Sequence, residues 1–229
     1  MTKISTINTR YHELALRPAL VLNTISNKNA KPMIDIDLLL TWGATYKKVK
    51  RDEIIFFEGG HANFYYQLVS GKVRWVSINE EGKEFIQMMV EKGESFGELP
   101  LFDDEPYAAT AIADEDSTVI RLHKTSFLQL LHENQDIHFA FTRLMAQRMR
   151  FKFLTLKVLA CYNPEHRISA LLQYFKTNNR HTCPKCNRVQ LTRQQIADMT
   201  GLRVETVIRA IRHLHTKGKL VIEKGKVYC

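Results

Sequence analysis

Residues 191–214 read LTRQQIADMTGLRVETVIRAIRHL and decide the fold of the C-terminal part of the chain. Thr192 and Gln195 stand three positions apart, the spacing of a capping box in which each side chain satisfies a free amide at a helix start. Gly201 is expected to end this first helix, because glycine readily adopts the left-handed conformation found after helix C-termini. A second helix follows at once, so the stretch is predicted to form a helix-turn-helix.

The second helix is predicted to have one apolar and one polar face. Its apolar residues recur at helical spacing and are Val204, Val207, Ala210, Ile211 and Leu214. Glu205, Arg209 and Arg212 lie on the other face. A carboxylate accepts from cytosine N4 and a guanidinium binds guanine O6 and N7 together, so these side chains suit a helix in the major groove of DNA. The alternative is an ordinary Glu–Arg pair on a solvated helix face, which stabilises a helix by about 0.2–0.5 kcal/mol.

Charge is distributed unevenly along the chain. The 229 residues contain 33 Lys or Arg and 24 Asp or Glu, a formal net charge of +9. Residues 161–229 hold 13 of the basic residues and 4 of the acidic ones, so residues 1–160 are balanced. This asymmetry is typical of a nucleic-acid-binding domain joined to a neutral one, and it favours the DNA interpretation of the second helix.

The last residues, KGKLVIEKGKVYC from position 217, contain two short β-prone runs around a Lys-Gly turn. We expect a hairpin, or wing, after the two helices. Lys224 and Lys226 lie at its tip and are available for DNA phosphates.

The first 160 residues contain glycines at positions 60, 71, 82 and 93, each eleven residues after the last. Short runs of strand character lie between them, among them FYYQLV, KVRWVSI and FIQMMV. Regularly spaced short strands predict a sandwich or barrel, and we expect an antiparallel β-barrel over roughly residues 46–123.

Residues 125–160 contain no Gly or Pro and are predicted to form one long helix, which Asn163-Pro164 would end. Apolar residues recur near every fourth position, at Phe141, Met145, Met149, Phe153, Leu156 and Leu159. A small barrel cannot cover a stripe of that length, so we expect the helix to pair with its own copy in a homodimer. The alternative is that the stripe packs entirely on its own barrel.

Composition limits the other classes of function. A length of 229 residues and a hydrophobic content of 45% suit two packed domains. No stretch approaches the roughly 20 apolar residues of a membrane span, and there is no signal-peptide pattern, which predicts a cytoplasmic protein without a membrane partner. No nucleophile elbow, phosphate loop or carboxylate pair with a His at motif spacing is present, so an enzyme is the weakest interpretation.

A barrel, a long helix and a winged helix-turn-helix in this order resemble the Crp/Fnr family of bacterial transcription regulators. The motifs that carry the resemblance are FFEGG, LVSGKVRW, EEGKE, GESFGELPLF and the helix-turn-helix sequence. The implied fold class is α+β: an N-terminal antiparallel β-barrel of the cyclic-nucleotide-binding jelly-roll kind, a long dimerisation helix and a C-terminal winged helix-turn-helix. The expected boundaries are an extension over 1–34, the effector-type barrel over 35–124, the long helix over 125–162 and the DNA-binding domain over 163–229.

The resemblance also implies roles for single residues. Glu205 and Arg209 would read the TGA core of a half-site, and Thr192, Arg193 and Gln194 would bind backbone phosphates. Val204 is the residue found in the Fnr-like branch, so an Fnr-like half-site is expected.

Two residues depart from that branch. Ile208 replaces Ser and could contact only a thymine methyl group or fill space. Arg203 replaces a Ser or Thr cap, which costs about 1 kcal/mol of helix stability unless a DNA phosphate takes over the capping role. The family further implies contact with RNA polymerase, a small signal bound in the barrel and regulation of promoters.

The signal site differs from the cyclic-nucleotide sensors of the family. Gly97 and Glu98 match their motif, but Ala108 and Ala109 stand where an Arg and a hydroxyl residue clamp the cyclic phosphate. Two methyl groups cannot replace the water shell of a phosphate, so cyclic AMP is not expected as the signal. The long-helix positions that would meet the purine carry Lys152 and Phe153, also unlike that branch.

The Cys and His residues of the chain limit which metal cofactors it could bind. No Cys precedes Cys161, which excludes an iron-sulfur cluster of the Fnr kind. Haem needs only one His and stays open, with candidates His61, His123, His132 and His138.

Cys183 and Cys186 form one CxxC, half of a zinc or redox motif. His181 with Cys229 or Cys161 could complete a zinc site. An exposed loop, a zinc site and a thiol switch are the three interpretations, and Lys185 and Arg188 in this loop are candidate polymerase contacts.

Two questions stay open at this level. Residues 1–33 form either a helix over the barrel or an arm. A nonspecific or architectural nucleic-acid binder with a non-sensing barrel is the alternative function, and it would bind random and palindromic duplexes equally.

Overall fold

The computed structural model describes residues 32–161 and 163–229, apart from the side chain of Cys161. The predicted N-terminal extension therefore lies almost entirely outside the described residues. Helix α2 (Ile36–Thr41) opens the described chain. Eight strands and one short helix follow: β1 (Thr45–Val49), β2 (Ile54–Phe56), β3 (Phe64–Ser70), β4 (Val73–Ile78), β5 (Glu84–Val90), β6 (Ser95–Phe96), α3 (Leu99–Asp103), β7 (Thr110–Ala113) and β8 (Ser117–His123).

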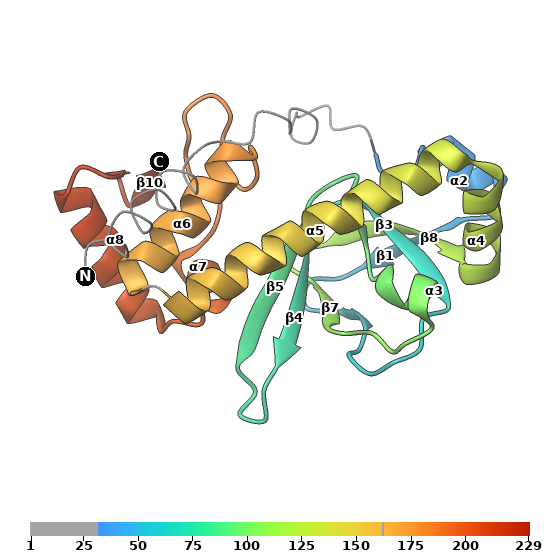
Figure 1. Cartoon of the computed structure of the whole chain (residues 1–229), viewed down its shortest axis with the longest axis horizontal. Helices are drawn as coiled ribbons and strands as arrows, with labels where there is room; N and C mark the ends of the chain where they lie inside the picture. Colours follow the sequence, from blue (N-terminus) through green and yellow to red (C-terminus); the bar gives the residue numbers. More distant parts are fainter. Residues whose placement is uncertain (1–31, 162) are drawn as a thin grey trace, which may run out of the picture.

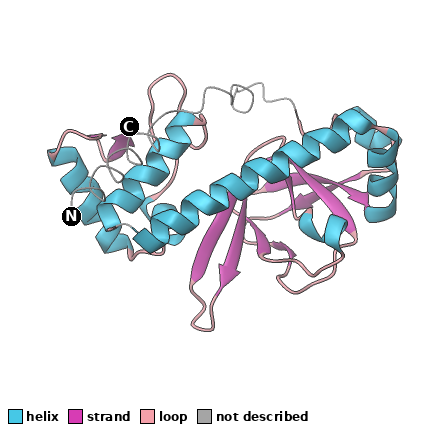
Figure 2. Ribbon diagram, in the orientation of Figure 1, coloured by secondary structure: helices cyan, strands magenta, loops and turns pink. Residues whose placement is uncertain are grey.

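The strands form two antiparallel four-stranded sheets, with the orders β1-β8-β3-β6 and β2-β7-β4-β5. The jelly-roll prediction is confirmed, but the two sheets (strands magenta in Figure 2) are not closed into the barrel that we expected, because no ladder joins one sheet to the other within residues 32–161. Buried side chains such as Tyr66 and Phe96 of the first sheet and Phe56 of the second sheet meet in the space between the sheets. Gly71 makes the turn from β3 to β4, where a Cβ atom would lie 2.2 Å from Ser117 Oγ.

The segment after β8 is not the single helix that we predicted. It contains α4 (Lys124–Glu133) and α5 (Gln135–Cys161), and the break at Asn134 has φ −127° and ψ 83°. The Asn134 side chain donates a hydrogen bond to Leu130 O (2.9 Å), so an amide closes α4 without Gly or Pro.

Phe141 on α5 was predicted to face a second copy of the chain, and the structure contradicts this. Its side chain is 1% exposed and its ring packs against Phe127 (5.3 Å between centroids) and Tyr65 (5.9 Å). This part of α5 belongs to the core of its own β domain.

The C-terminal part contains α6 (Pro164–Thr177), α7 (Arg193–Thr200), α8 (Val204–Thr216), β9 (Val221–Glu223) and β10 (Lys226–Tyr228). Asn163 caps α6 by accepting from His166 N at 3.0 Å, so the predicted stop at Asn163-Pro164 is confirmed. The capping box of Thr192 and Gln195 begins α7, and Gly201 ends it in the left-handed conformation. The predicted wing is the β9–β10 hairpin, whose turn residues Lys224 and Gly225 both have positive φ.

Helix α5 runs from α4 along the β domain to the C-terminal helices (Figure 1). At that end the C-terminal domain packs on the β4–β5–β7 side of the second sheet. One apolar cluster contains Val76, Ile86, Met89 and Ile112 of this sheet together with buried residues of α6, α7 and α8. Among the helices of residues 32–161 and 163–229, none combines the length and apolar character needed to cross a bilayer.

Candidate nucleic-acid interface

Helix α8 has the two faces that its sequence predicts. Its buried residues are Val207, Ala210, Ile211 and Leu214, while Val204 and Ile208 are half-buried. Glu205, Arg209 and Arg212 are exposed. No ion pair joins Glu205 to Arg209 in the part of the chain that the structure describes, so the alternative of a helix-stabilising pair is not realised here. Both groups are available to a ligand.

The start of α8 lacks a side-chain cap. Arg203 holds the N-cap position with an extended backbone (φ −76°, ψ 146°), and its side chain makes no capping hydrogen bond. The first amides of α8 are therefore left for an external acceptor, as the sequence predicts.

Helix α7 and the wing lie together beside α8. Arg193, which is half-buried, donates to Gly225 O in the wing turn (3.4 Å), and burial lowers the pKa of its guanidinium. Thr192, Gln194, Lys224 and Lys226 are exposed, although Gln194 donates to Asp198 (2.8 Å). The predicted phosphate-binding side chains thus come from the N-terminal end of α7 and from the wing turn. The hydrogen bond from Arg193 to Gly225 connects these two parts.

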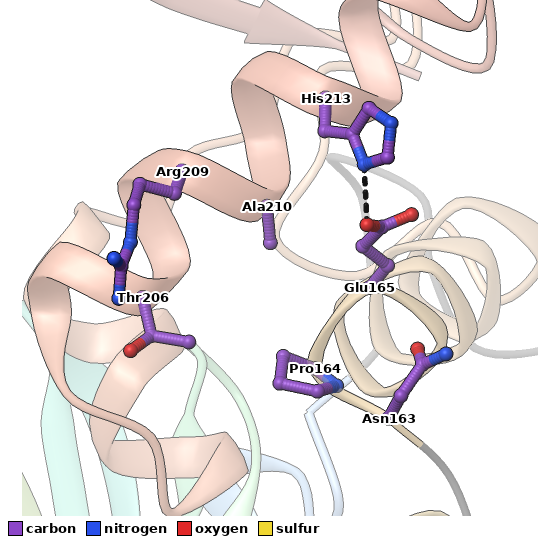
Figure 3. A pocket seen from close by; sticks show the side chains of 7 residues that line it. All are labelled: Asn163, Pro164, Glu165, Thr206, Arg209, Ala210 and His213. Atoms are coloured by element: carbon purple, nitrogen blue, oxygen red, sulfur yellow. Dashed lines mark hydrogen bonds and ion pairs between the residues drawn. The ribbon is translucent and has the colours of Figure 1, made fainter.

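A pocket runs beside the middle of α8. Figure 3 shows its lining, which is Asn163, Pro164, Glu165, Thr206, Arg209, Ala210 and His213. Glu165 at the start of α6 contacts His213 and accepts from Lys217 at 3.2 Å, and the hydrogen bond from His213 is the main cause of its lowered pKa. The contacts of Glu165 with His213 and Lys217 hold α6 against α8 on the side away from Arg209. The pocket leaves open space beside the Arg209 guanidinium.

The space beside Gly97, where the family motif places a ligand, is filled by aromatic rings. Phe56 and Tyr107 stack with centroids 3.7 Å apart, and a Cβ atom on Gly97 would lie 2.5 Å from the Phe56 ring. Ala109 is buried, its carbonyl accepting from Trp75 Nε1 (3.1 Å), and Ala108 is exposed. Neither alanine side chain offers a donor to an anion.

Glu98 is fully buried and forms an ion pair with Arg148 of α5. Arg148 also donates to Ser95 O at 2.6 Å. Burial lowers the pKa of Arg148 to about 10, so it stays cationic at neutral pH. The second carboxylate oxygen, Glu98 Oε2, is buried without a hydrogen-bond partner among the described residues.

Arg148 was missed in the sequence, although it lies on the inward face of α5 together with Phe141 and Val158, where a charged residue signals a buried partner. The two α5 residues predicted for this site lie elsewhere. Lys152 contacts Gln87 of β5, and Phe153 is 64% exposed.

Among the described residues, the side chains proposed as metal ligands do not come together in one site. The haem candidates His61, His123, His132 and His138 are all exposed. In the CxxC turn, Cys183 is half-buried and Cys186 exposed, while the His181 ring faces Glu91. No group of three or more His, Cys, Asp or Glu side chains that could hold a metal is found in residues 32–161 and 163–229.

Comparison with known proteins agrees with this architecture. Residues 46–134 match the family model of the cyclic nucleotide-binding domain, and residues 166–228 match that of the Crp-like helix-turn-helix domain. The chain belongs to the Crp/Fnr family of DNA-binding transcription regulators, which confirms the resemblance inferred from its motifs.

Individual relatives are distant. The cAMP-activated global transcriptional regulator CRP of Salmonella typhimurium is 30% identical over 174 residues, which are 75% of this chain and 82% of that protein. The solved structure of FixK2 from Bradyrhizobium japonicum matches with a TM-score of 0.69 at 24% identity, over 81% of this chain and 91% of its own. A CooA mutant from Carboxydothermus hydrogenoformans has a TM-score of 0.71 at 17% identity, over 84% of this chain and 85% of its own. The two structures show a shared fold.

Proposed function

We propose that the protein is a homodimeric regulator that binds a palindromic DNA site with TGA-like half-sites and responds to a signal other than cyclic AMP. The observation that carries this proposal is the exposed face of α8. Glu205 and Arg209 stand one turn apart on it, without an ion pair between them in the described residues. Phosphate-binding candidates on α7 and the wing lie beside them.

The homodimer is supported by the outer face of α5. Phe139, Met149, Phe153 and Leu156 are each at least 60% exposed, a large apolar stripe for a helix in water. Their positions follow the three-and-four spacing of a coiled-coil seam, with Thr142, Ala146 and Ala160 at the intervening seam positions. Pairing this stripe with a second copy would bring two α8 helices into one assembly, as a palindromic site requires.

The nature of the signal follows from the filled pocket. The named relative is cAMP-activated, but this chain has methyl groups at the phosphate-clamp positions and a Phe56–Tyr107 stack next to Gly97. A cyclic phosphate would have to be desolvated there without a cation from Ala108 or Ala109. The loop with Lys185 and Arg188 remains the candidate contact for RNA polymerase.

Selection of duplexes from a random library by the full-length, ligand-free protein at physiological salt tests the proposal. We expect enrichment of a palindrome with TGA-like arms. Salt-sensitive binding to every duplex, without enrichment even when cell extract is added, would contradict it and favour a nonspecific binder.

A further inference from the structure

Carboxylates of the β domain line the surface on which the DNA-binding domain rests. We call Glu84, Glu91, Glu94 and Asp114 the acidic edge. Glu84 is the first residue of β5, and Asp114 follows the last residue of β7. Glu91 and Glu94 lie in the turn between β5 and β6. Glu91 and Glu94 meet cationic or polar groups of the basic C-terminal domain, so charge is complementary there, whereas Glu84 faces Asp198 and Glu205 across a pocket.

The first contact involves the segment between α6 and α7. Arg180 donates to Glu94 (2.8 Å) and to Met89 O (3.2 Å), with 19% of its side chain exposed. His181 contacts Glu91 through its backbone N–H (3.2 Å) and ring Nδ1 (3.1 Å). Burial raises the pKa of Glu91, but the hydrogen bond and charge of His181 and the charge of Arg180 outweigh it and lower the pKa to about 2.

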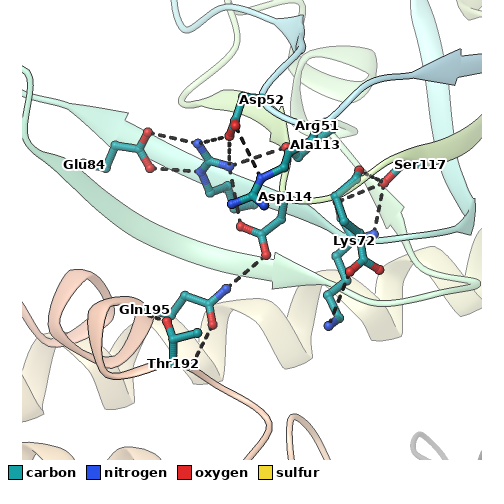
Figure 4. A network of polar contacts seen from close by, with 11 residues as sticks. Arg51, Asp52, Lys72, Glu84, Ala113, Asp114, Ser117, Thr192 and Gln195 are labelled. Carbon is teal, nitrogen blue, oxygen red and sulfur yellow. Dashed lines mark hydrogen bonds and ion pairs between the residues drawn. The ribbon is translucent and has the colours of Figure 1, made fainter.

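The second contact is made by the capping box of α7. Gln195 accepts from Thr192 N through Oε1 (2.8 Å) and donates through Nε2 to Asp114 (3.0 Å), as Figure 4 shows. Arg74 holds Asp114 from the other side at 3.5 Å. The end of α7 that is proposed to meet a DNA phosphate therefore already has a carboxylate of the β domain beside it.

The third contact faces the start of the recognition helix. A pocket is lined on one side by Lys83 and Glu84 and on the other by residues of α7, of the turn after it and of the start of α8, namely Gln194, Asp198, Leu202, Arg203, Val204 and Glu205. The start of β5 thus lies across one pocket from the first turn of α8.

DNA would have to occupy this same space. A recognition helix enters a major groove about 12 Å wide, and the phosphates that border the groove pass the N-terminal ends of both helices. Glu84 and Asp114 lie there, and they would repel phosphates as well as exclude them.

We propose that the acidic edge is a docking surface for the chain's own DNA-binding domain, and that docking on it competes with DNA. This inference rests on the proposed function of α7 and α8. The described arrangement is then the DNA-free form, and α7 and α8 must move away from Glu84 and Asp114 before a duplex can bind. Arg148 connects the acidic edge to the buried Glu98. It forms an ion pair with Glu98 and donates to the backbone oxygen of Ser95, the residue after Glu94.

The test compares DNA affinity of full-length variants. Glu91→Gln and Asp114→Asn each remove one charge of the docking surface. Because a protein that must open binds less tightly in proportion to its closed fraction, a docked population of about nine-tenths allows a gain of up to about tenfold when docking is lost. We expect each variant to bind a TGA-type palindrome about three- to tenfold more tightly than the wild type.

Glu105→Gln and Glu133→Gln, each of which also removes one charge, are the matched controls. These exposed carboxylates lie near α3 and in α4, at the end of the β domain away from the C-terminal helices, so they test the effect of net charge alone. Control affinity should change by less than about twofold. Folded variants that bind the palindrome no better than the controls would overturn the proposal.

Hydrogen exchange separates this inference from the proposed function. Amides of β5 and α7 should exchange faster in Glu91→Gln and Asp114→Asn than in the wild type or the controls, whether or not DNA is added. Unchanged exchange would overturn the docking surface. Equal affinity of every variant for palindromic and scrambled duplexes would instead refute sequence-specific binding, while faster exchange would still support docking.

Discussion

On α8, Glu205 and Arg209 are exposed without an ion pair between them in the described residues, whereas beside Gly97 the rings of Phe56 and Tyr107 fill the space where the family motif predicts a ligand. Both regions carry family motifs, and both sit on well-packed scaffolds. A helix with free polar groups can bind a new surface at once, but a pocket filled by stacked rings binds nothing until they move. A family motif therefore shows the fold and does not by itself show the ligand.

The largest expected effect is on the dimer through which α8 would act. Replacing Met149 and Leu156 by Glu puts charges into the exposed stripe, and we expect a monomer in sedimentation. Affinity for the palindrome should fall about hundredfold or more, because each α8 then binds its half-site alone.

The double variant Arg150→Gln with Lys157→Gln changes the charge of α5 equally but lies off the stripe, and it should remain dimeric. A dimer that survives both glutamates would show that α5 does not form the contact.

The aromatic filling of the pocket predicts a large effect on stability. Phe56→Ala removes a buried ring (8% exposed), and we expect the free energy of unfolding to fall by about 3–5 kcal/mol in urea denaturation. Its neighbour Phe57 is 63% exposed, and Phe57→Ala should change stability by less than about 0.5 kcal/mol. Equal losses at the two positions would refute the filled pocket.

On the other side of the comparison, Arg209→Ala should remove discrimination at the core guanine, a loss of about 1–3 kcal/mol for the cognate duplex only. Lys224→Ala should weaken binding to all duplexes alike. It should also reduce the slope of log affinity against log salt concentration by about one. Anisotropy titrations with cognate and single-base variant duplexes measure both. If the two substitutions act identically, α8 does not read bases.

The smallest effect concerns pH. The folded-state pKa of Glu91, about 2, is below the unfolded value, so its ionisation stabilises the fold above about pH 4.5 and this contribution is lost as the pH falls toward 2. The stability difference between wild type and Glu91→Gln should therefore shrink as the pH falls from about 4.5 toward 2. A difference that stays constant down to pH 3 would argue against the contacts of Glu91 with His181 and Arg180.

Local signals were predictable from the sequence. The capping box, Gly201 and the Lys224-Gly225 turn each depend on neighbouring residues, and all three were confirmed. The same is true of the polar face of α8.

Non-local packing was not predictable. Whether two sheets close into a barrel depends on pairing between distant strands, and the break at Asn134 depends on one side-chain hydrogen bond. The sequence also could not tell that Phe141 faces inward while Phe139, two residues earlier, faces outward. The partners of Arg148 and Arg180 lie 50 or more residues away in the sequence, so their burial is visible only in the fold.

The most direct test of the account measures DNA affinity with and without cyclic AMP. The full-length protein is titrated, at physiological salt, against the selected TGA-type palindrome and a scrambled duplex of the same composition. The account predicts a clear preference for the palindrome that cyclic AMP leaves unchanged. A preference that arises only when cyclic AMP is added would contradict it.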